Sequence, residues 1–184
     1  MRLVSNLRRC QLIVMHSGFV ALTLLVVACD NQNTDRDLVK AIKTNAQVLE
    51  LSAENKVLKE RGEKVFESNC KVCHQLNGAG VENNFPPLAN SEWVNGPTNR
   101  LVAIILHGID GEITVQSKKY KGTMPPFKDR LPLKDIAAVL TYIRSSWGNQ
   151  SSAVTLEQVQ ETYFATKSRK PVWSGEGEIN AQSW

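Results

Sequence analysis

Several residue types are scarce in this 184-residue chain, and each scarcity excludes a class of protein. Charge is nearly balanced, with 22 Lys+Arg against 18 Asp+Glu, so the concentrated basic stripe of a nucleic-acid-binding protein is absent. We therefore expect no nucleic-acid partner. Internal repeats and long low-complexity tracts are also absent, which leaves room for one modest domain with additions.

The first 29 residues differ in composition from the rest of the chain. Arg2, Arg8 and Arg9 are the only charged residues before Asp30. The most apolar part, residues 19–28, has the length of a signal-peptide core and is short for a transmembrane span. The segment therefore predicts an export signal.

The leader ends in Val26-Val27-Ala28-Cys29, which resembles a bacterial lipoprotein signal. The resemblance implies cleavage before Cys29 and lipidation of its thiol, and Asp30 resembles an inner-membrane retention signal. The alternative is an uncleaved signal-anchor helix that starts near Leu12. Either alternative predicts an exported protein tethered at the periplasmic face of the inner membrane, and several acyl chains give a stable lipid anchor.

Removing this leader leaves 19 basic and 18 acidic residues, and few side chains that bind metals or cofactors. Those that remain are Cys29, Cys70, Cys73, His74, His107 and Met124. Because Cys29 is assigned to the lipid, the other two Cys must pair with each other or bind something else.

Composition and periodicity divide the chain into four parts. We expect a signal peptide over 1–29, a linker and spacer helix over 30–54, a main domain over 55–148 and a C-terminal extension over 149–184. Apolar spacing predicts helices at 38–57, 55–69, 100–107, 133–147 and 155–166.

The remaining segments lack a regular pattern. Gly and Pro residues predict an irregular stretch over 108–132, and Gly148 is placed to end the preceding helix. The tail from 167 to 184 is expected to pack loosely or stay mobile.

Cys70-Lys71-Val72-Cys73-His74 is the strongest signal in the sequence, because the Cys-x-x-Cys-His spacing is typical of covalent haem attachment. On one helical turn, positions 70, 73 and 74 share a side. Both sulfurs can then form thioethers with the haem vinyl groups while His74 ligates the iron as the proximal ligand. The pattern predicts one covalent haem c.

Three other readings of this motif are weaker. A structural zinc needs about four ligands, and His107 is the only further His after the leader. A thioredoxin-like redox pair requires a βαβ setting, whereas these surroundings are helix and loop. A plain disulfide leaves His74 unexplained.

The opposite axial ligand in such a protein is Met or His. Met124, the single Met after the leader, lies in Gly122-Thr123-Met124-Pro125-Pro126, where prolines stiffen the loop around its sulfur. His107 is the alternative, but we expect it to end a helix and donate to the last carbonyls. The sequence favours Met124.

Together these features resemble class I bacterial cytochromes c over about residues 55–148. The matching features are Gly62 and Phe66, the Cys-x-x-Cys-His motif, 85–88, Trp93, 120–127 and 136–144. The resemblance implies an all-α class I cytochrome c fold, with N- and C-terminal helices crossing, haem in a loop-rich pocket and, here, an N-terminal helical extension. It extends to cytochrome modules of periplasmic dehydrogenases, copper nitrite reductases and terminal oxidases.

The resemblance also implies roles for particular residues. Gly62 and Phe66 lie where the first helix crosses the last. The carbonyl of Pro87, or of Pro86, accepts the second imidazole N–H of His74. Trp93 and Tyr120 reach the haem propionates or simply pack.

The resemblance implies single-electron transfer, because a His/Met-ligated iron has no open site. The protein is then not an enzyme in itself but a tethered carrier or an electron-transfer subunit of a respiratory or dehydrogenase complex. Lys118, Lys119 and Lys121 either steer a redox partner or form an ordinary solvated face. A haem enzyme or gas sensor with a labile sixth ligand is the alternative function, and a structural lipoprotein with a vestigial site is a third.

Overall fold

A computed structural model describes residues 32–169 and 172–183, with side chains from residue 36 onward. The proposed leader and Cys29 lie outside these residues. Within the described part of the chain, no helix combines the length and apolar character needed to cross a bilayer. Of the described residues, those up to Glu50 belong to one compact unit and those from Leu51 belong to a second.

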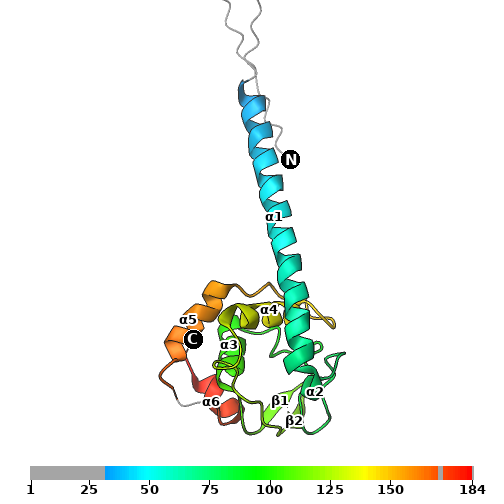
Figure 1. The fold of residues 1–184 in the computed structure, drawn as a ribbon, viewed down its shortest axis with the longest axis vertical. Helices are drawn as coiled ribbons and strands as arrows, with labels where there is room; N and C mark the ends of the chain where they lie inside the picture. Colours follow the sequence, from blue (N-terminus) through cyan, green and yellow to red (C-terminus); the bar gives the residue numbers. More distant parts are fainter. Residues whose placement is uncertain (1–31, 170–171, 184) are drawn as a thin grey trace, which may run out of the picture. The chain divides into compact units, whose positions relative to one another are not determined.

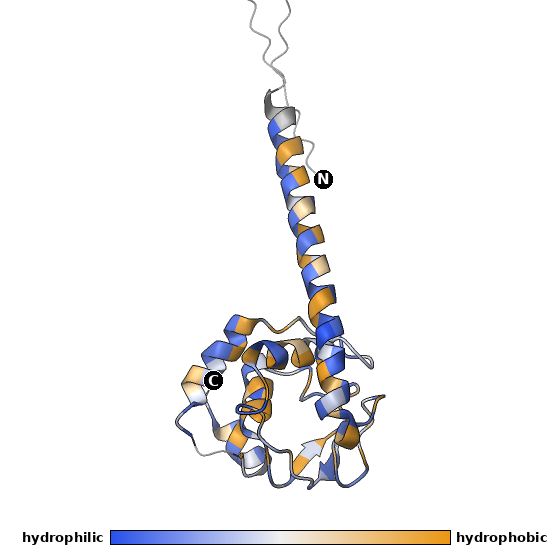
Figure 2. Cartoon of the chain, in the orientation of Figure 1, coloured by the Kyte–Doolittle hydropathy of each residue, from blue (hydrophilic) through white to orange (hydrophobic). Residues whose placement is uncertain are grey.

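Helix α1 runs without interruption over Gln32–Asn69, so the two helices expected at 38–57 and 55–69 are one. No Pro occurs in this range, and Gly62 is its only Gly, so nothing in the sequence breaks the helix. Polar and apolar residues alternate around it along its length (Figure 2). In the first unit its apolar side chains, among them Leu38 and Ile42, are exposed.

The second unit is mainly helical, as predicted, with its elements in the order shown in Figure 1. The elements that follow α1 are α2 Lys71–His74, α3 Thr98–His107, β1 Ile113–Val115, β2 Lys118–Tyr120, α4 Leu133–Arg144, α5 Leu156–Thr166 and α6 Gly175–Ala181. The two strands pair antiparallel with Ile113 opposite Tyr120. The stretch 108–132 is therefore not irregular throughout, because it contains this short hairpin.

The end of α1 crosses α4 at very short range. A Cβ atom added to Gly62 would lie 2.0 Å from the Ala138 carbonyl oxygen, so only Gly fits here. Phe66, one turn later, is fully buried beside the Tyr142 and Trp147 rings. This crossing agrees with the helix contact that the resemblance implied.

Helix α4 ends at Arg144, three residues before the predicted end at Trp147. The Ser145 and Ser146 hydroxyls donate to carbonyls of the last turn, and the Asn149 amide donates to the Ile143 carbonyl. Because side chains satisfy the final carbonyls, the chain leaves the helix early. The prediction that Gly148 caps this helix is wrong, since the C-cap residue is Ser145.

The tail is neither loose nor patternless, contrary to expectation. Trp173 is 1% exposed and Ile179 is 0% exposed, and α6 follows Trp173 directly. Both side chains belong to a second buried cluster that also contains Trp93 and Ile113. Burial of these two large side chains is enough to fix the tail on the domain.

Candidate functional site

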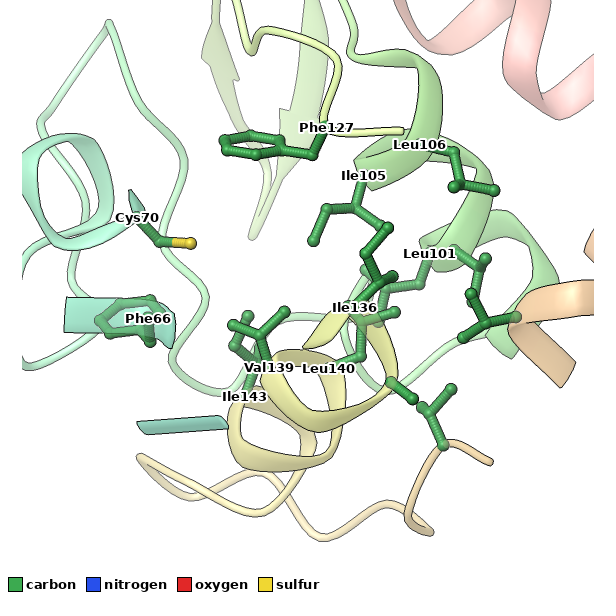
Figure 3. Packing of buried hydrophobic residues seen from close by; sticks show 14 of the residues in the cluster. Phe66, Cys70, Leu101, Ile105, Leu106, Phe127, Ile136, Val139, Leu140 and Ile143 are labelled. Atoms are coloured by element: carbon green, nitrogen blue, oxygen red, sulfur yellow. The ribbon is translucent and has the colours of Figure 1, made fainter. Parts of the chain in front are cut away.

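A largely apolar cavity of about 270 Å³ lies in the second unit. Cys70, Cys73 and His74 line it from the region after α1, and Pro87 and Met124 line it from two loops. The structure thus brings to one cavity every cofactor-binding residue predicted from the sequence. Figure 3 shows the Cys70 thiol facing the open space bordered by Ile105 and Phe127.

The Cys-x-x-Cys-His segment forms a single turn at the end of α1. The backbone N–H groups of Cys73 and His74 both donate to the Cys70 carbonyl, at 3.2 and 3.0 Å. This turn places the two thiols and the imidazole on the cavity side together. Cys70 and Cys73 are both free thiols, so neither is consumed by a disulfide.

The Cys70 thiol is in a poor environment for redox catalysis. Burial, with a smaller contribution from Cys73, raises the pKa of Cys70 to about 12. A reactive cysteine needs a lowered pKa, because the thiolate is the nucleophile. The site is therefore unlike a thioredoxin-type pair. Among the described residues, no group of three His, Cys, Asp or Glu side chains is arranged to hold a metal ion such as zinc.

The His74 imidazole is held by one backbone acceptor. Its Nδ1 lies 3.1 Å from the Pro86 carbonyl oxygen. Since a carbonyl can only accept, Nδ1 carries the proton, and the Nε2 lone pair remains available for a metal. Desolvation by burial lowers the pKa of His74, which favours the neutral form that ligates iron. The acceptor is Pro86, one of the two prolines that the resemblance left open for this role, and Pro87 lines the cavity.

Gly80 allows the loop to carry Pro86 under the His74 ring. Its φ is +68°, and an added Cβ would lie 2.2 Å from the Phe85 carbonyl oxygen. The Gly80 N–H donates to the His74 carbonyl, and the Val81 N–H donates to the Phe85 carbonyl. A side chain at position 80 would strain the backbone and displace the acceptor of the His74 N–H.

Met124 borders the cavity from the loop between β2 and α4. It is partly buried and packs against both hydrophobic clusters of the domain. Its backbone exchanges hydrogen bonds with Ile109, at 3.0 and 2.8 Å. The thioether is thus attached to a fixed backbone position on the cavity wall.

His107 is not arranged as a ligand. It is fully buried and does not line the cavity. Its Nε2 lies 2.8 Å from the Thr166 hydroxyl oxygen, and that hydroxyl donates its only proton to the Thr162 carbonyl. His107 Nε2 therefore donates to Thr166, whereas the sequence suggested donation to helix carbonyls. Burial, together with the nearby Arg169 charge, lowers the pKa of His107 to about 4.

Trp93 and Tyr120, the two aromatic candidates for a contact with the haem propionates, make other contacts in the structure. The Trp93 indole N–H donates to the Thr114 carbonyl at 2.8 Å, although its ring lines the cavity. Tyr120 is buried in the second cluster and does not line the cavity. Packing is the role that the structure gives to both. Arg130 also lines the cavity, although nothing in its sequence position predicted this.

The three lysines of the predicted docking face are paired with acidic side chains. Lys118 lies 3.4 Å from Glu82, and Lys119 and Lys121 lie 2.7 and 3.4 Å from the two oxygens of Glu112. These ion pairs are exposed, so water and salt screen them and they contribute little to the stability of the fold. They also leave this face less basic than the sequence suggested.

Comparison with known proteins adds an independent line of evidence. The family model for cytochrome c matches residues 59–147. Cytochrome c-552 of Thermus thermophilus is 39% identical over 92 residues, which cover 48% of this chain and 69% of that protein.

Longer relatives are similar over a smaller share of their own length. The cytochrome c subunit of alcohol dehydrogenase (quinone) from Gluconobacter oxydans is 29% identical over 129 residues, covering 67% of this chain and 25% of that subunit. The gluconate 2-dehydrogenase cytochrome c subunit of Pantoea cypripedii is 34% identical over 108 residues, which cover 54% of this chain and 23% of that subunit. This chain therefore spans about a quarter of each of these two subunits.

The cavity is lined largely by apolar side chains, and it offers two free thiols and an imidazole with an available Nε2 within one turn of chain. These features and the comparisons agree: the chain belongs to the cytochrome c family and carries one covalently bound haem c, the cofactor of electron-transfer cytochromes.

Proposed function

We propose that this protein passes single electrons through a haem c that is attached at Cys70 and Cys73 and ligated by His74 and Met124. The observation that carries the proposal is the shared cavity, which all four side chains line. When bound, the haem iron supplies a one-electron couple. With His on one side and Met on the other, no coordination position is open to a substrate.

Other residues of the chain favour ligation of the iron by His74 and Met124. The Pro86 carbonyl orients the His74 ring and increases its basicity as a ligand. The apolar cavity walls exclude water and so raise the reduction potential, as does Met ligation. His107 competes poorly with Met124, because it is buried outside the cavity and its Nε2 is bonded to Thr166.

The redox partner that we propose is a dehydrogenase. Three relatives of this chain carry the names of cytochrome subunits of alcohol, fructose and gluconate 2-dehydrogenases. The chain would act as a tethered carrier or as an electron-transfer subunit of such a complex. We propose that it is exported and held by a lipid on Cys29 at the periplasmic face of the inner membrane, on the strength of the leader pattern.

The docking surface that we propose includes Lys118, Lys119 and Lys121. Their pairing with Glu82 and Glu112 leaves a net charge of +1 on the five side chains. Steering of an acidic partner is then modest and fades with salt.

Optical spectroscopy of the purified haem protein tests the ligand assignment. The ferric form should show the long-wavelength Met–iron charge-transfer band, and the ferrous form should not bind carbon monoxide. Met124→Ala should abolish the band and allow carbon monoxide to bind, whereas His107→Gln should leave both unchanged. A wild-type protein without the band that binds carbon monoxide readily would contradict the carrier function and support the haem enzyme or gas sensor.

A further inference from the structure

The backbone of Met124 is held by the chain segment just after α3. The Ile109 N–H donates to the Met124 carbonyl at 3.0 Å, and the Met124 N–H donates to the Ile109 carbonyl at 2.8 Å. The Thr123 hydroxyl adds a bond of 2.7 Å to the Asp110 carboxylate. The position of the Met124 thioether therefore depends on where residues 109 and 110 lie.

The C-terminal tail, defined here as residues 172–181, holds the opposite edge of the same segment. The Val172 N–H donates to the His107 carbonyl at 2.6 Å, and the Trp173 N–H donates to the Gly108 carbonyl at 3.0 Å. The Asp110 N–H donates back to the Trp173 carbonyl at 2.8 Å. Residues 107–110 thus lie between Met124 and the C-terminal tail, bonded to both.

Trp173 fixes the C-terminal tail to the domain. Its side chain is almost completely buried, in the hydrophobic cluster that contains Ile109 and against which Met124 packs. Its indole N–H donates to the Ala103 carbonyl at 3.1 Å, and the Arg169 guanidinium lies 3.3 Å from the ring centroid. A buried tryptophan with these contacts is a strong anchor for its segment, because its removal leaves a large cavity.

The start of the C-terminal tail is held under backbone strain. Val172 has φ of +72°, a conformation that a β-branched residue rarely adopts. Such strain persists only where the surrounding contacts determine the conformation. The Val172 hydrogen bond and the neighbouring Trp173 anchor supply those contacts.

Helix α6 secures the other end of the C-terminal tail against the cavity wall. The Glu176 carboxylate accepts hydrogen bonds from the Thr114 N–H at 2.8 Å and from the Thr114 hydroxyl at 3.2 Å. The Glu176 N–H donates to the Glu112 carbonyl at 3.1 Å. Thr114 is in β1, whose residues Ile113 and Val115 line the cavity.

We propose that the C-terminal tail positions Met124 for iron ligation, with Trp173 as the main positioning residue. This inference rests on the proposed role of Met124 as a ligand. A thioether is a neutral, weak ligand, so it stays bound only if its loop rarely opens. The C-terminal tail lowers the frequency of opening by bonding the segment that carries the Met124 backbone.

The rate at which imidazole replaces Met124 in the ferric haem protein tests this proposal. At saturating imidazole that rate reports the opening of the loop. Trp173→Ala should raise it at least about tenfold, because local opening responds to the loss of the anchor. The same variant should weaken the Met–iron charge-transfer band and lower the reduction potential. Trp173→Phe keeps a buried ring and loses only the indole donor, so its limiting rate should stay within about 1.5-fold of wild type.

Val154→Ala is the matched control, because Val154 is fully buried in the cluster that contains neither Trp173 nor Ile109, and its N–H is bonded to the Thr141 hydroxyl in α4. It should reduce overall stability and leave the imidazole rate and the band unchanged. If Trp173→Ala does not fold, Glu176→Gln carries the test and should raise the rate about threefold through weaker α6 docking.

Three results would overturn the inference, and they are distinguishable. A wild-type protein without the charge-transfer band refutes the ligand assignment, and the positioning role falls with it. A wild-type protein with the band, and tail variants with wild-type imidazole rates, refute the positioning role alone. A Val154→Ala rate that rises as much as that of Trp173→Ala also refutes it, since general destabilisation then explains the effect.

Discussion

A methyl group added at Gly62 should force apart the two helices that frame the haem domain. The Cβ of Gly62→Ala would lie 2.0 Å from the Ala138 carbonyl oxygen, 2.6 Å from its carbon and 2.8 Å from the Tyr142 Cβ. A backbone carbonyl cannot rotate away as a flexible side chain can. The helices must therefore separate by about 1.4 Å to reach an ordinary carbon–oxygen contact of about 3.4 Å.

The cost of this separation can be worked out from the packing. Overpacking a well-filled core typically costs about 1–3 kcal/mol, and because a backbone carbonyl must move here we expect a gross cost of about 3–5 kcal/mol. Separation also loosens the Phe66 ring against Tyr142 and Trp147, which lie 5.6 and 4.9 Å away between centroids. The higher helix propensity of Ala offsets about 1 kcal/mol of this cost. The net loss should be about 2–4 kcal/mol, a large part of a typical unfolding free energy.

Urea unfolding followed by far-ultraviolet circular dichroism measures this loss. With an m-value of about 2 kcal/mol/M, the midpoint should fall by about 1–2 M while m stays constant. Gly177→Ala is the matched control, because a Cβ there meets nothing within 4 Å in α6. That variant should be unchanged or stabilised by up to about 1 kcal/mol. A Gly62→Ala midpoint within about 0.3 M of wild type would show that the crossing is not tight.

Three further predictions concern charge and protonation. His107 has a folded-state pKa of about 4 and an unfolded value near 6.5, so the unfolded chain binds the extra proton first. The free energy of unfolding should therefore fall by up to about 3 kcal/mol as pH drops from 7 to 4. In a denaturation series over this pH range, the unfolding free energy of His107→Gln should depend less steeply on pH. Equal pH dependence in the variant and the wild type would refute the role of His107. Arg144 is buried and donates to the carbonyls of residues 94, 96 and 152. Arg144→Met should cost about 3 kcal/mol by leaving these acceptors unpaired, measured as a lowered melting temperature, and an unchanged melting temperature would contradict it. Charge reversal at Lys118, Lys119 and Lys121 should slow electron exchange with the partner and flatten its salt dependence in stopped-flow measurements, while unchanged rates would leave these lysines as ordinary surface.

The sequence was sufficient for the chemistry because that chemistry depends on local spacing. Cys70, Cys73 and His74 lie on one helical turn whatever the rest of the fold does, so the motif alone predicted covalent haem. Met124 was found by elimination in a chain with few candidate ligands. Gly62 and Phe66 were assigned to the helix crossing through the family resemblance, and they lie there.

Contacts between residues distant in sequence were decided by the tertiary structure alone. Pro86 and Pro87 are neighbours, so their distance from His74 along the sequence does not show which of them bonds to it. Only the path of the loop through Gly80 brings the Pro86 carbonyl to His74. The early end of α4 likewise depends on the Ser145 hydroxyl and other side chains that no periodicity records.

The C-terminal tail shows the same division most clearly. Its sequence has no apolar periodicity, so propensity predicted a loose end. Its order comes from Trp173 entering a cluster made by α3 and the β1–β2 hairpin, and from backbone bonds to residues 107–110. Local sequence determined which residues can bind and ligate haem in this protein. Burial and backbone pairing between distant segments, which a local pattern does not encode, decided what holds those residues in place.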